Sequence, residues 1–350
     1  MSEKSWIRKR WKLVLNVVTL VALIIVFYLS RHQVGATVKN LGQVHAWALL
    51  LLIPVEFLNY HSQARLYQKL FAIVGNKLSY KFLFRASLEL NFVNHVFPSG
   101  GVTGMSYFTL RLRDGKKISS GKASLMHVLK IGLYFVSYEI ALIFGVIALA
   151  VMGRVNNLVI LVASSITTLL IVGTLIFIYI IGSRERINSF FTSITKILNR
   201  IIQIIRPKYP ETISIERVRF IFDDVHNNYQ EIKKDYSKLK APFIYAFIAN
   251  ATEIAAVYVV FIAFGHLVNI GAIILAYGIA NFAGLISVLP GGVGIYEALM
   301  TATLASTGVS AGVSLPAIVM YRILNTLIQI PPGYYLYQKA LRSGQNETTN

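Results

Sequence analysis

The sequence predicts an all-α polytopic membrane protein, and its composition and the lengths of its apolar runs carry that prediction. Of the 350 residues, 55% are hydrophobic and only 14% are charged, which leaves too few charges to cover a soluble fold. Several apolar runs contain 18 to 25 residues, the length that a helix needs to cross a hydrocarbon core of about 30 Å. The absence of cysteine excludes disulfides, thiolate catalysis and cysteine-ligated metal sites.

Six uninterrupted apolar segments are the predicted membrane-spanning helices. In chain order they are Leu13–Ser30, Ala46–Tyr60, Ile131–Met152, Leu158–Gly182, Pro242–Phe264 and Leu315–Tyr337. The first begins like a signal peptide, but no small-residue cleavage site follows Ser30, so we expect a retained anchor. Two more apolar stretches, Ser87–Leu110 and Ala276–Leu304, are interrupted by the sequences Pro98-Ser99-Gly100-Gly101 and Pro290-Gly291-Gly292.

Basic residues are concentrated in alternate connecting segments. Of the 34 lysines and arginines, 30 lie in residues 1–12, 61–86, 111–130, 183–241 and 339–350, whereas three lie in 31–45 and 153–157. Because basic residues stay on the cytoplasmic side, this distribution predicts a multi-pass protein of the cell membrane with cytoplasmic N and C termini. Six full spans then require each interrupted stretch to return to its own side as a re-entrant hairpin, the first from the cytoplasm and the second from outside. Eight full crossings are the alternative, but they would place the basic stretch 111–130 outside.

The two halves of the chain, residues 1–157 and 158–338, are predicted to form an inverted repeat. Each contains two spans, an interrupted stretch and a further span, in that order. The interruptions share letters, since Gly100-Gly101-Val102 matches Gly291-Gly292-Val293. Segments broken by Gly and Pro at corresponding positions of inverted halves indicate a transport site near the bilayer midplane. In the other interpretation, the glycines only allow tight turns and close packing.

The second interruption carries a resemblance to a known family. The run Leu289-Pro290-Gly291-Gly292-Val293-Gly294-Ile295-Tyr296-Glu297, followed by Tyr321-Arg322-Ile323-Leu324 and Pro331, resembles the C-terminal signature of the lysylphosphatidylglycerol synthase transmembrane-region family, also called flippase-like or UPF0104-type. The family's earlier motif is matched only in part, by Pro98 to Gly104 and by Arg111, because its acidic and first basic positions are missing. The resemblance covers nearly the whole chain and implies a single flippase-like membrane domain.

The resemblance also implies a function. Full-length members of the family join the membrane region to a soluble domain that transfers lysine from lysyl-tRNA to phosphatidylglycerol, and the membrane region is thought to flip the product. We therefore expect translocation or binding of an anionic or modified phospholipid, with membrane phospholipids rather than nucleic acid as partners and no cofactor. Three alternatives remain open: the lysyltransferase activity itself, a small-solute or lipid-carrier transporter similar to the DedA family, and a partner of a lipid-modifying enzyme such as a glycosyltransferase that uses a lipid-linked substrate.

Charged residues inside apolar segments are costly and are therefore the first site candidates. Glu297 is the sharpest, because Arg322 is available to neutralise it, either as a structural pair or as a headgroup site that opens when phosphate takes the arginine. Lys130 either belongs to the site or snorkels to the interface. The helix starts after Gly101 and Gly292 would offer N–H groups to phosphate. The predicted lipid site comprises Pro98, Gly100, Gly101, Gly104, Arg111, Lys130, Pro290, Gly291, Gly292, Gly294, Glu297 and Arg322.

The other polar residues of the apolar segments are expected to have lesser roles. Glu89 is a further candidate, whereas Glu56, Glu139 and Glu253 are expected to be hydrogen-bonded packing residues. His95 and His127 are expected to be ordinary polar packing residues, because no second ligand stands at metal-site spacing. The sequence contains no recognisable catalytic constellation and no nucleotide-binding motif.

Residues 183–241 are predicted to form a cytoplasmic amphipathic helical insertion. Apolar residues from Ile187 to Ile205 recur at helical spacing beside Lys196, Arg200 and Arg206, which is typical of a helix lying in the interface against anionic lipids. A heptad seam then runs from Ile215 to Leu239. This second helix is expected to pack on the first one or, alternatively, to form an oligomer through 215–239.

Overall fold

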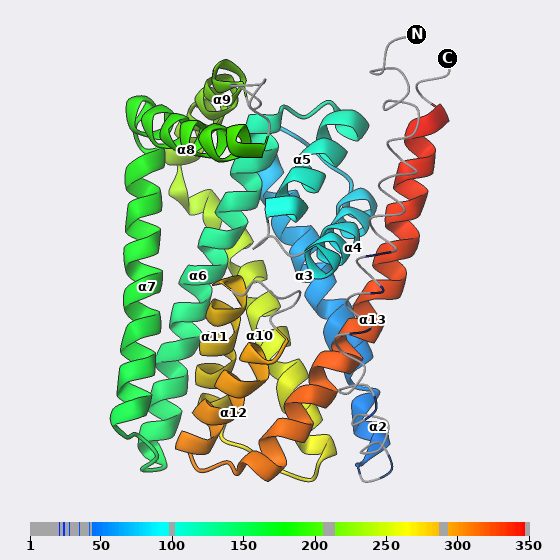
Figure 1. Cartoon of the computed structure of the whole chain (residues 1–350), viewed down its shortest axis with the longest axis vertical. Helices are drawn as coiled ribbons and strands as arrows, with labels where there is room; N and C mark the ends of the chain where they lie inside the picture. Colours follow the sequence, from blue (N-terminus) through cyan, green and yellow to red (C-terminus); the bar gives the residue numbers. More distant parts are fainter. Residues whose placement is uncertain are drawn as a thin grey trace.

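A computed structural model describes residues 44–97, 102–205, 214–286 and 293–346, together with a few isolated positions before residue 44. These residues form helices and contain no β-strand, which confirms the all-α prediction for this part of the chain. The helices are α2 (Ala46–Leu49), α3 (Leu52–Ile73), α4 (Tyr80–Val96), α5 (Val102–Lys116), α6 (Ser120–Val151), α7 (Asn157–Ile181), α8 (Arg184–Ile205), α9 (Ile215–Lys233), the 3-10 helix η1 (Tyr236–Leu239), α10 (Lys240–Ala263), α11 (Ile270–Ile286), α12 (Ile295–Ser306) and α13 (Ala311–Asn346) (Figure 1). The predicted span Leu13–Ser30 and both interruptions lie outside the described residues.

Among the described residues, four helices are long and apolar enough to cross a membrane. They are α6, α7, η1 continued by α10, and α13 as far as Arg342. Each contains most or all of a predicted span, and α7 agrees with its predicted span to within one residue at each end. In α7 a run of apolar residues begins after the capping residue Asn156, whose side chain accepts a hydrogen bond from the backbone N–H of Val159.

The predicted span Ala46–Tyr60 begins where α2 begins, but it is wrong in being continuous and in ending at Tyr60. The short helix α2 stops at Leu49, and α3 begins at Leu52 and continues to Ile73. The prediction ended at Tyr60 because polar residues follow, but Ser62 and Gln63 are buried against neighbouring helices. Hydropathy therefore underestimated the length of α3, since its polar residues face protein.

The helices are arranged around a central pair, α3 and α10, which pack along each other (Figure 1). Two further contacts join a long helix to a shorter helix from the other half of the chain: α6 packs on α11, and α13 packs on α4. Glycines permit both contacts. A Cβ at Gly271 would collide with the carbonyl oxygen of Gly145 in α6, and a Cβ at Gly333 would lie 2.8 Å from the carbonyl oxygen of Leu88 in α4.

The two pairs of shorter helices lie at different levels of the molecule. Helices α4 and α5 pack together toward the end where α8 and α9 lie, whereas α11 and α12 pack together toward the opposite end (Figure 1). Each pair flanks one of the interrupted sequences. The core is divided accordingly into one apolar cluster that includes Phe71, Leu83 and Phe108 and another that includes Phe261, Ile273 and Met300.

Three loops that are poor in basic residues lie together at the end opposite α8 and α9. They line one pocket of about 400 Å³, formed by residues 152–154, 266–272 and 307–313. The side-chain amide of Asn156 donates to the carbonyl of Ser306 (2.7 Å), and that of Asn269 donates to the carbonyl of Ala148 (3.1 Å). These three loops, which the distribution of basic residues assigns to one side of the membrane, thus lie side by side in the structure.

Helices α8 and α9 form the predicted insertion, and α8 lies across the end of α7 (Figure 1). The two helices pack on each other through stacked Phe191 and Phe222 rings, whose centroids are 3.5 Å apart. Arg184 makes two hydrogen bonds of 2.8 Å to Asp223. Helix α9 also packs on α6. The expectation that the second helix packs on the first is confirmed, and an oligomer through 215–239 stays a prediction.

Candidate functional site

The first pair of short helices contains a buried ion pair. Glu89 of α4 is almost fully buried, and its Oε2 lies 3.0 Å from Nε of Arg111 in α5. The hydroxyl of Tyr107 donates a second hydrogen bond of 2.7 Å to the same oxygen. The sequence singled out Glu89 and Arg111 separately but did not pair them. Gly104 lies at the contact of the two helices, because a Cβ there would collide with Asn94 and Leu90.

The second pair of short helices is tied to the next long helix by the predicted partners Glu297 and Arg322. Nη1 of Arg322 in α13 bonds Oε1 of Glu297 in α12, and the guanidinium lies 4.8 Å from the ring centroid of Tyr296. The other oxygen of Glu297 accepts a hydrogen bond of 2.7 Å from the backbone N–H of Gly294. Gly294 has a φ of +90°, a conformation that side chains disfavour.

Glu297 therefore caps α12 as well as neutralising Arg322. This differs from the expectation that the start of α12 offers its N–H groups to phosphate, because at least one of them already bonds a carboxylate. Pro98, Gly100, Gly101, Pro290, Gly291 and Gly292 lie outside the described residues, so the two interruptions stay predictions as binding sites.

Lys130 occupies the interior of α6 and is buried. The snorkelling interpretation of this residue is wrong, because α6 begins at Ser120 and not near residue 130. Its Nζ donates to Oε1 of Gln63 at 2.7 Å and lies about 5 Å from the ring centroids of Tyr67 and Tyr134. Within the described ranges, no carboxylate lies within ion-pairing distance of Lys130. The ammonium is thus held by an amide and two ring faces.

Lys130 begins a buried hydrogen-bond chain that runs from α6 through α3 to α10. Gln63 donates to Oδ1 of Asn59 at 2.6 Å, and Asn59 donates to Oε1 of Glu253 at 3.2 Å. Asn59 also donates to the hydroxyl of Thr252 (2.9 Å) and to the carbonyl of Ala249 (3.0 Å). These bonds join the two central helices near the middle of both.

The chain continues from Glu253 into α13. The hydroxyl of Tyr321 donates to Oε2 of Glu253 at 3.4 Å and accepts from Asn325 at 3.4 Å. Gln329 donates to Oδ1 of Asn325 at 2.7 Å and to Oε2 of Glu56 at 3.0 Å. The expectation that Glu56 and Glu253 are hydrogen-bonded is confirmed, and both belong to one network.

The amide side chains of this network are not among the site residues predicted from the sequence. Glu56, Asn59 and Gln63 recur at steps of three and four along α3, and Tyr321, Asn325 and Gln329 recur at steps of four along α13. This spacing places each set on one helix face. The helical spacing of these amides in the sequence therefore already indicates a polar stripe along one face of each apolar helix.

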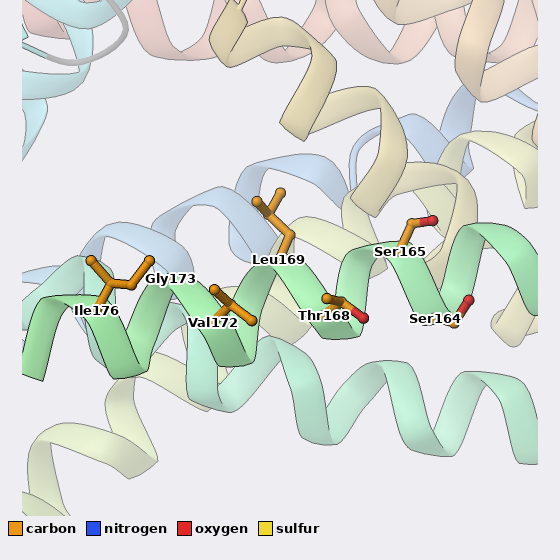
Figure 2. Close-up of a pocket in the computed structure, with 7 residues that line it drawn as sticks. All are labelled: Ser164, Ser165, Thr168, Leu169, Val172, Gly173 and Ile176. Carbon is orange, nitrogen blue, oxygen red and sulfur yellow. The ribbon is translucent and has the colours of Figure 1, made fainter.

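The remaining candidates lie outside the network. His127 bonds the hydroxyl of Tyr67 (2.7 Å) and His95 bonds the carbonyl of Asn91 (2.9 Å), which is ordinary polar packing as expected. Oε2 of Glu139 has no hydrogen-bond partner among the described residues. A shallow pocket on the outer face of α7 is lined by Ser164, Ser165, Thr168, Leu169, Val172, Gly173 and Ile176 (Figure 2). One helix supplies this whole lining and it contains no charged group.

Comparison with known proteins agrees with the resemblance noted in the sequence. A UPF0104 membrane protein of Methanothermobacter thermautotrophicus is 29% identical over 109 residues, which cover 31% of this chain and 32% of that protein. The matched stretch thus spans about a third of the length of this relative. The family described as "Lysylphosphatidylglycerol synthase TM region" matches residues 13–333, almost the entire chain. The chain therefore belongs to the lysylphosphatidylglycerol synthase transmembrane-region family and is an integral membrane protein.

Proposed function

We propose that this protein binds an anionic or modified phospholipid and moves it across the cell membrane, with Arg322 and Lys130 attracting the phosphate of the headgroup. The observation that carries the proposal is the state of Lys130, a buried ammonium whose nearest polar partner is a neutral amide. A buried cation without a carboxylate partner is costly and suits a site that receives an anion.

Lys130 and Arg322 hold similar positions in the two halves. Each lies in the long helix that follows one pair of short helices, α6 after α5 and α13 after α12. A phosphate that bonds the Arg322 guanidinium would compete with Glu297, which would keep its bond to Gly294 and so preserve the cap of α12. Replacement of the Glu297 carboxylate by phosphate at Arg322 would therefore leave the first turn of α12 capped.

The proposed architecture is an inverted repeat of six spans and two re-entrant hairpins with cytoplasmic termini. It is supported by the reciprocal packing of α6 on α11 and of α13 on α4, and by the three clustered loops that are poor in basic residues. In this cysteine-free chain, a cysteine at Asn269 or Ser310 is expected to react with an impermeant reagent outside intact cells. A cysteine at Ser193 or Lys238 is expected to be protected, and labelling at Lys238 would reverse the orientation.

Reconstituted vesicles test the function. We expect wild-type protein to move a fluorescent phosphatidylglycerol analogue between leaflets, and Lys130→Met or Arg322→Lys to slow that movement at least tenfold. Arg322→Lys keeps the charge but loses the planar fork that grips phosphate. Arg113→Gln is the matched control, because it removes a basic residue from α5 whose side chain is exposed and bonds only Asp114 among the described residues. Equal rates for all four proteins would contradict the proposed site.

The same preparation separates the alternatives. Vesicles supplied with lysyl-tRNA are expected to form no lysyl lipid, and a protein-dependent product would favour the lysyltransferase. Movement of a lipid-linked sugar or of a small solute instead of phosphatidylglycerol would favour the glycosyltransferase partner or the DedA-like transporter.

A further inference from the structure

Glu56 and Glu253 lie on one ring of residues between the central helices and α13, in which side-chain contacts form every link except that from Asn59 to Glu56, which is one turn of the α3 backbone. Going round the ring, Glu253 contacts Asn59 on α3, which lies three residues from Glu56. Glu56 contacts Gln329, and the path returns through Asn325 and Tyr321 to Glu253. Glu56, Asn59 and Gln329 are all less than 5% exposed, whereas Glu253 and Asn325 are partly buried, so most of the ring lies away from water.

The charges of the ring do not balance. It contains two carboxylates, and Lys130, which reaches Glu253 only through Gln63 and Asn59, is the single cation joined to it. With every group ionised, the cluster carries one net negative charge in a region of low dielectric, which is unfavourable. One bound proton makes the lipid-free cluster neutral, and the carboxyl group that is still ionised is then free to take up a further proton when an anion binds.

Other neighbours of Glu253 do not supply the missing positive charge. The groups that interact with it are Glu56, Asn59 and Tyr60 on α3, Lys130 and Tyr134 on α6, Tyr277 on α11, Tyr296 on α12 and Tyr321 on α13. Helix α2 contributes no titratable side chain, and η1 joins the start of α10, about 20 Å along the helix from Glu253. Arg322, which follows Tyr321 in α13 and lies over the Tyr296 ring, is paired with Glu297, so Lys130 is the described cation whose charge is left to the ring.

We propose that this ring binds one exchangeable proton, carried by Glu253 or Glu56, and that the proton accompanies the lipid across the membrane. The proposal rests on the proposed function, because the lipid phosphate supplies the coupling. When phosphate draws Lys130 to itself, Gln63 and Asn59 lose their cationic partner and Glu253 becomes a better proton acceptor. Anion binding and proton binding then favour each other, and this linkage is reciprocal.

The chemistry around the carboxylates suits a proton better than a sodium ion. Gln329 and Asn59 present N–H groups to Glu56 and Glu253, and Tyr321 presents its hydroxyl proton. A hard metal cation needs several converging oxygen acceptors instead of donors. A monoanionic lipid that moves with one proton carries no net charge, so transport should respond to the pH gradient and be indifferent to the membrane potential.

The experiment uses vesicles that contain the fluorescent phosphatidylglycerol analogue, with the potential clamped by potassium and an ionophore. A gradient of one pH unit is expected to enrich the analogue up to about tenfold in the leaflet that faces the alkaline side. Glu253→Gln is expected to equilibrate the lipid without responding to the gradient, and Glu56→Gln provides a second test if that variant folds poorly. Glu139→Gln, which removes an acid of α6 outside the ring, is expected to behave like wild type.

A second measurement does not depend on transport. Short-chain phosphatidylglycerol added to purified protein in weakly buffered detergent is expected to cause uptake of about one proton per protein, and short-chain phosphatidylcholine none. Movement of lipid with no gradient response and no proton uptake would overturn the coupling and leave the proposed function intact. A response to a sodium gradient instead would overturn the choice of ion. If no lipid moves, the proposed function fails, and absence of proton uptake would then reject the ring as a proton site as well.

Discussion

Each of the two pairs of short helices contains a glutamate–arginine ion pair, but the two ion pairs join different helices. Glu89 and Arg111 join α4 to α5, so their ion pair closes the first pair of helices on itself. Glu297 and Arg322 join α12 to α13, so their ion pair fastens the second pair of helices to the following long helix. The arginine side chain is 25% exposed in the first case and 16% in the second. Two similar pairs of short helices can therefore contain the same kind of ion pair and still differ in which helices that ion pair joins.

The largest effect is expected for Arg322→Gln. Removing the guanidinium leaves the buried Glu297 carboxylate without its charged partner, which typically costs about 3–5 kcal/mol. Thermal unfolding of the purified protein in detergent measures the loss. The double variant Glu297→Gln with Arg322→Gln is expected to recover much of the stability, and a double variant as unstable as the single one would refute a pairwise role.

Arg111→Gln is expected to destabilise less, by about 2 kcal/mol. Glu89 keeps the hydrogen bond from Tyr107, and water can reach the partly exposed position of Arg111. The same unfolding assay compares the two arginine variants directly. A loss as large as that of Arg322→Gln would erase the difference between the two regions.

Gly294→Ala is expected to cost about 1 kcal/mol, because alanine disfavours the positive φ at this cap. Gly132→Ala is the matched control, since a Cβ at this position of α6 meets no atom within 4 Å. It is expected to be neutral or slightly stabilising. Equal destabilisation by both substitutions would show that the cap geometry is unimportant.

The smallest effect concerns the α8–α9 insertion between α7 and α10. Hydrogen bonds from Arg184 and Asn188 lower the pKa of Asp223 to about 2. A depressed carboxyl pKa stabilises the folded state above its ordinary value near 3.8, and the contribution is lost as the pH falls through about 2. Spin labels at Ser193→Cys and Glu216→Cys are expected to report separation of α8 from α9 only in this window. Asp223→Asn should shift or abolish that pH dependence.

The sequence predicted a helix most accurately where a single pattern of residues determines where that helix begins and ends. Helix α7 is apolar throughout and faces outward along much of its length, so hydropathy located it closely. The span predicted for α3 was too short, because the polar residues that follow Tyr60 are buried against other helices and hydropathy alone does not detect such burial.

It was harder to predict which charged residues form ion pairs with each other than to predict which residues belong to the candidate site. Glu297 and Arg322 were predicted as partners because few alternatives existed, whereas Glu89 had several basic residues nearby in sequence. The amides Asn59, Gln63 and Gln329 were missed because an uncharged side chain in a span is less costly than a charged one and attracts less attention. Only the packing of α3, α10 and α13 shows that these amides connect two acids.

The glycine contacts between α6 and α11, and between α13 and α4, have a mechanical consequence. Helices normally lock against each other because ridges of side chains fill grooves in the partner, and this interdigitation fixes their crossing angle. Gly145 and Gly271 face each other without side chains, and Gly333 offers none to α4, so Ile274 and Phe92 contribute the side chains at these close approaches. Shear along these two contacts therefore meets lower steric barriers than at a contact between large side chains. Both contacts lie between a long helix and a shorter helix from the other half of the chain, so sliding there would displace the shorter helix along the long one while the bonds of Asn59 keep α3 and α10 together.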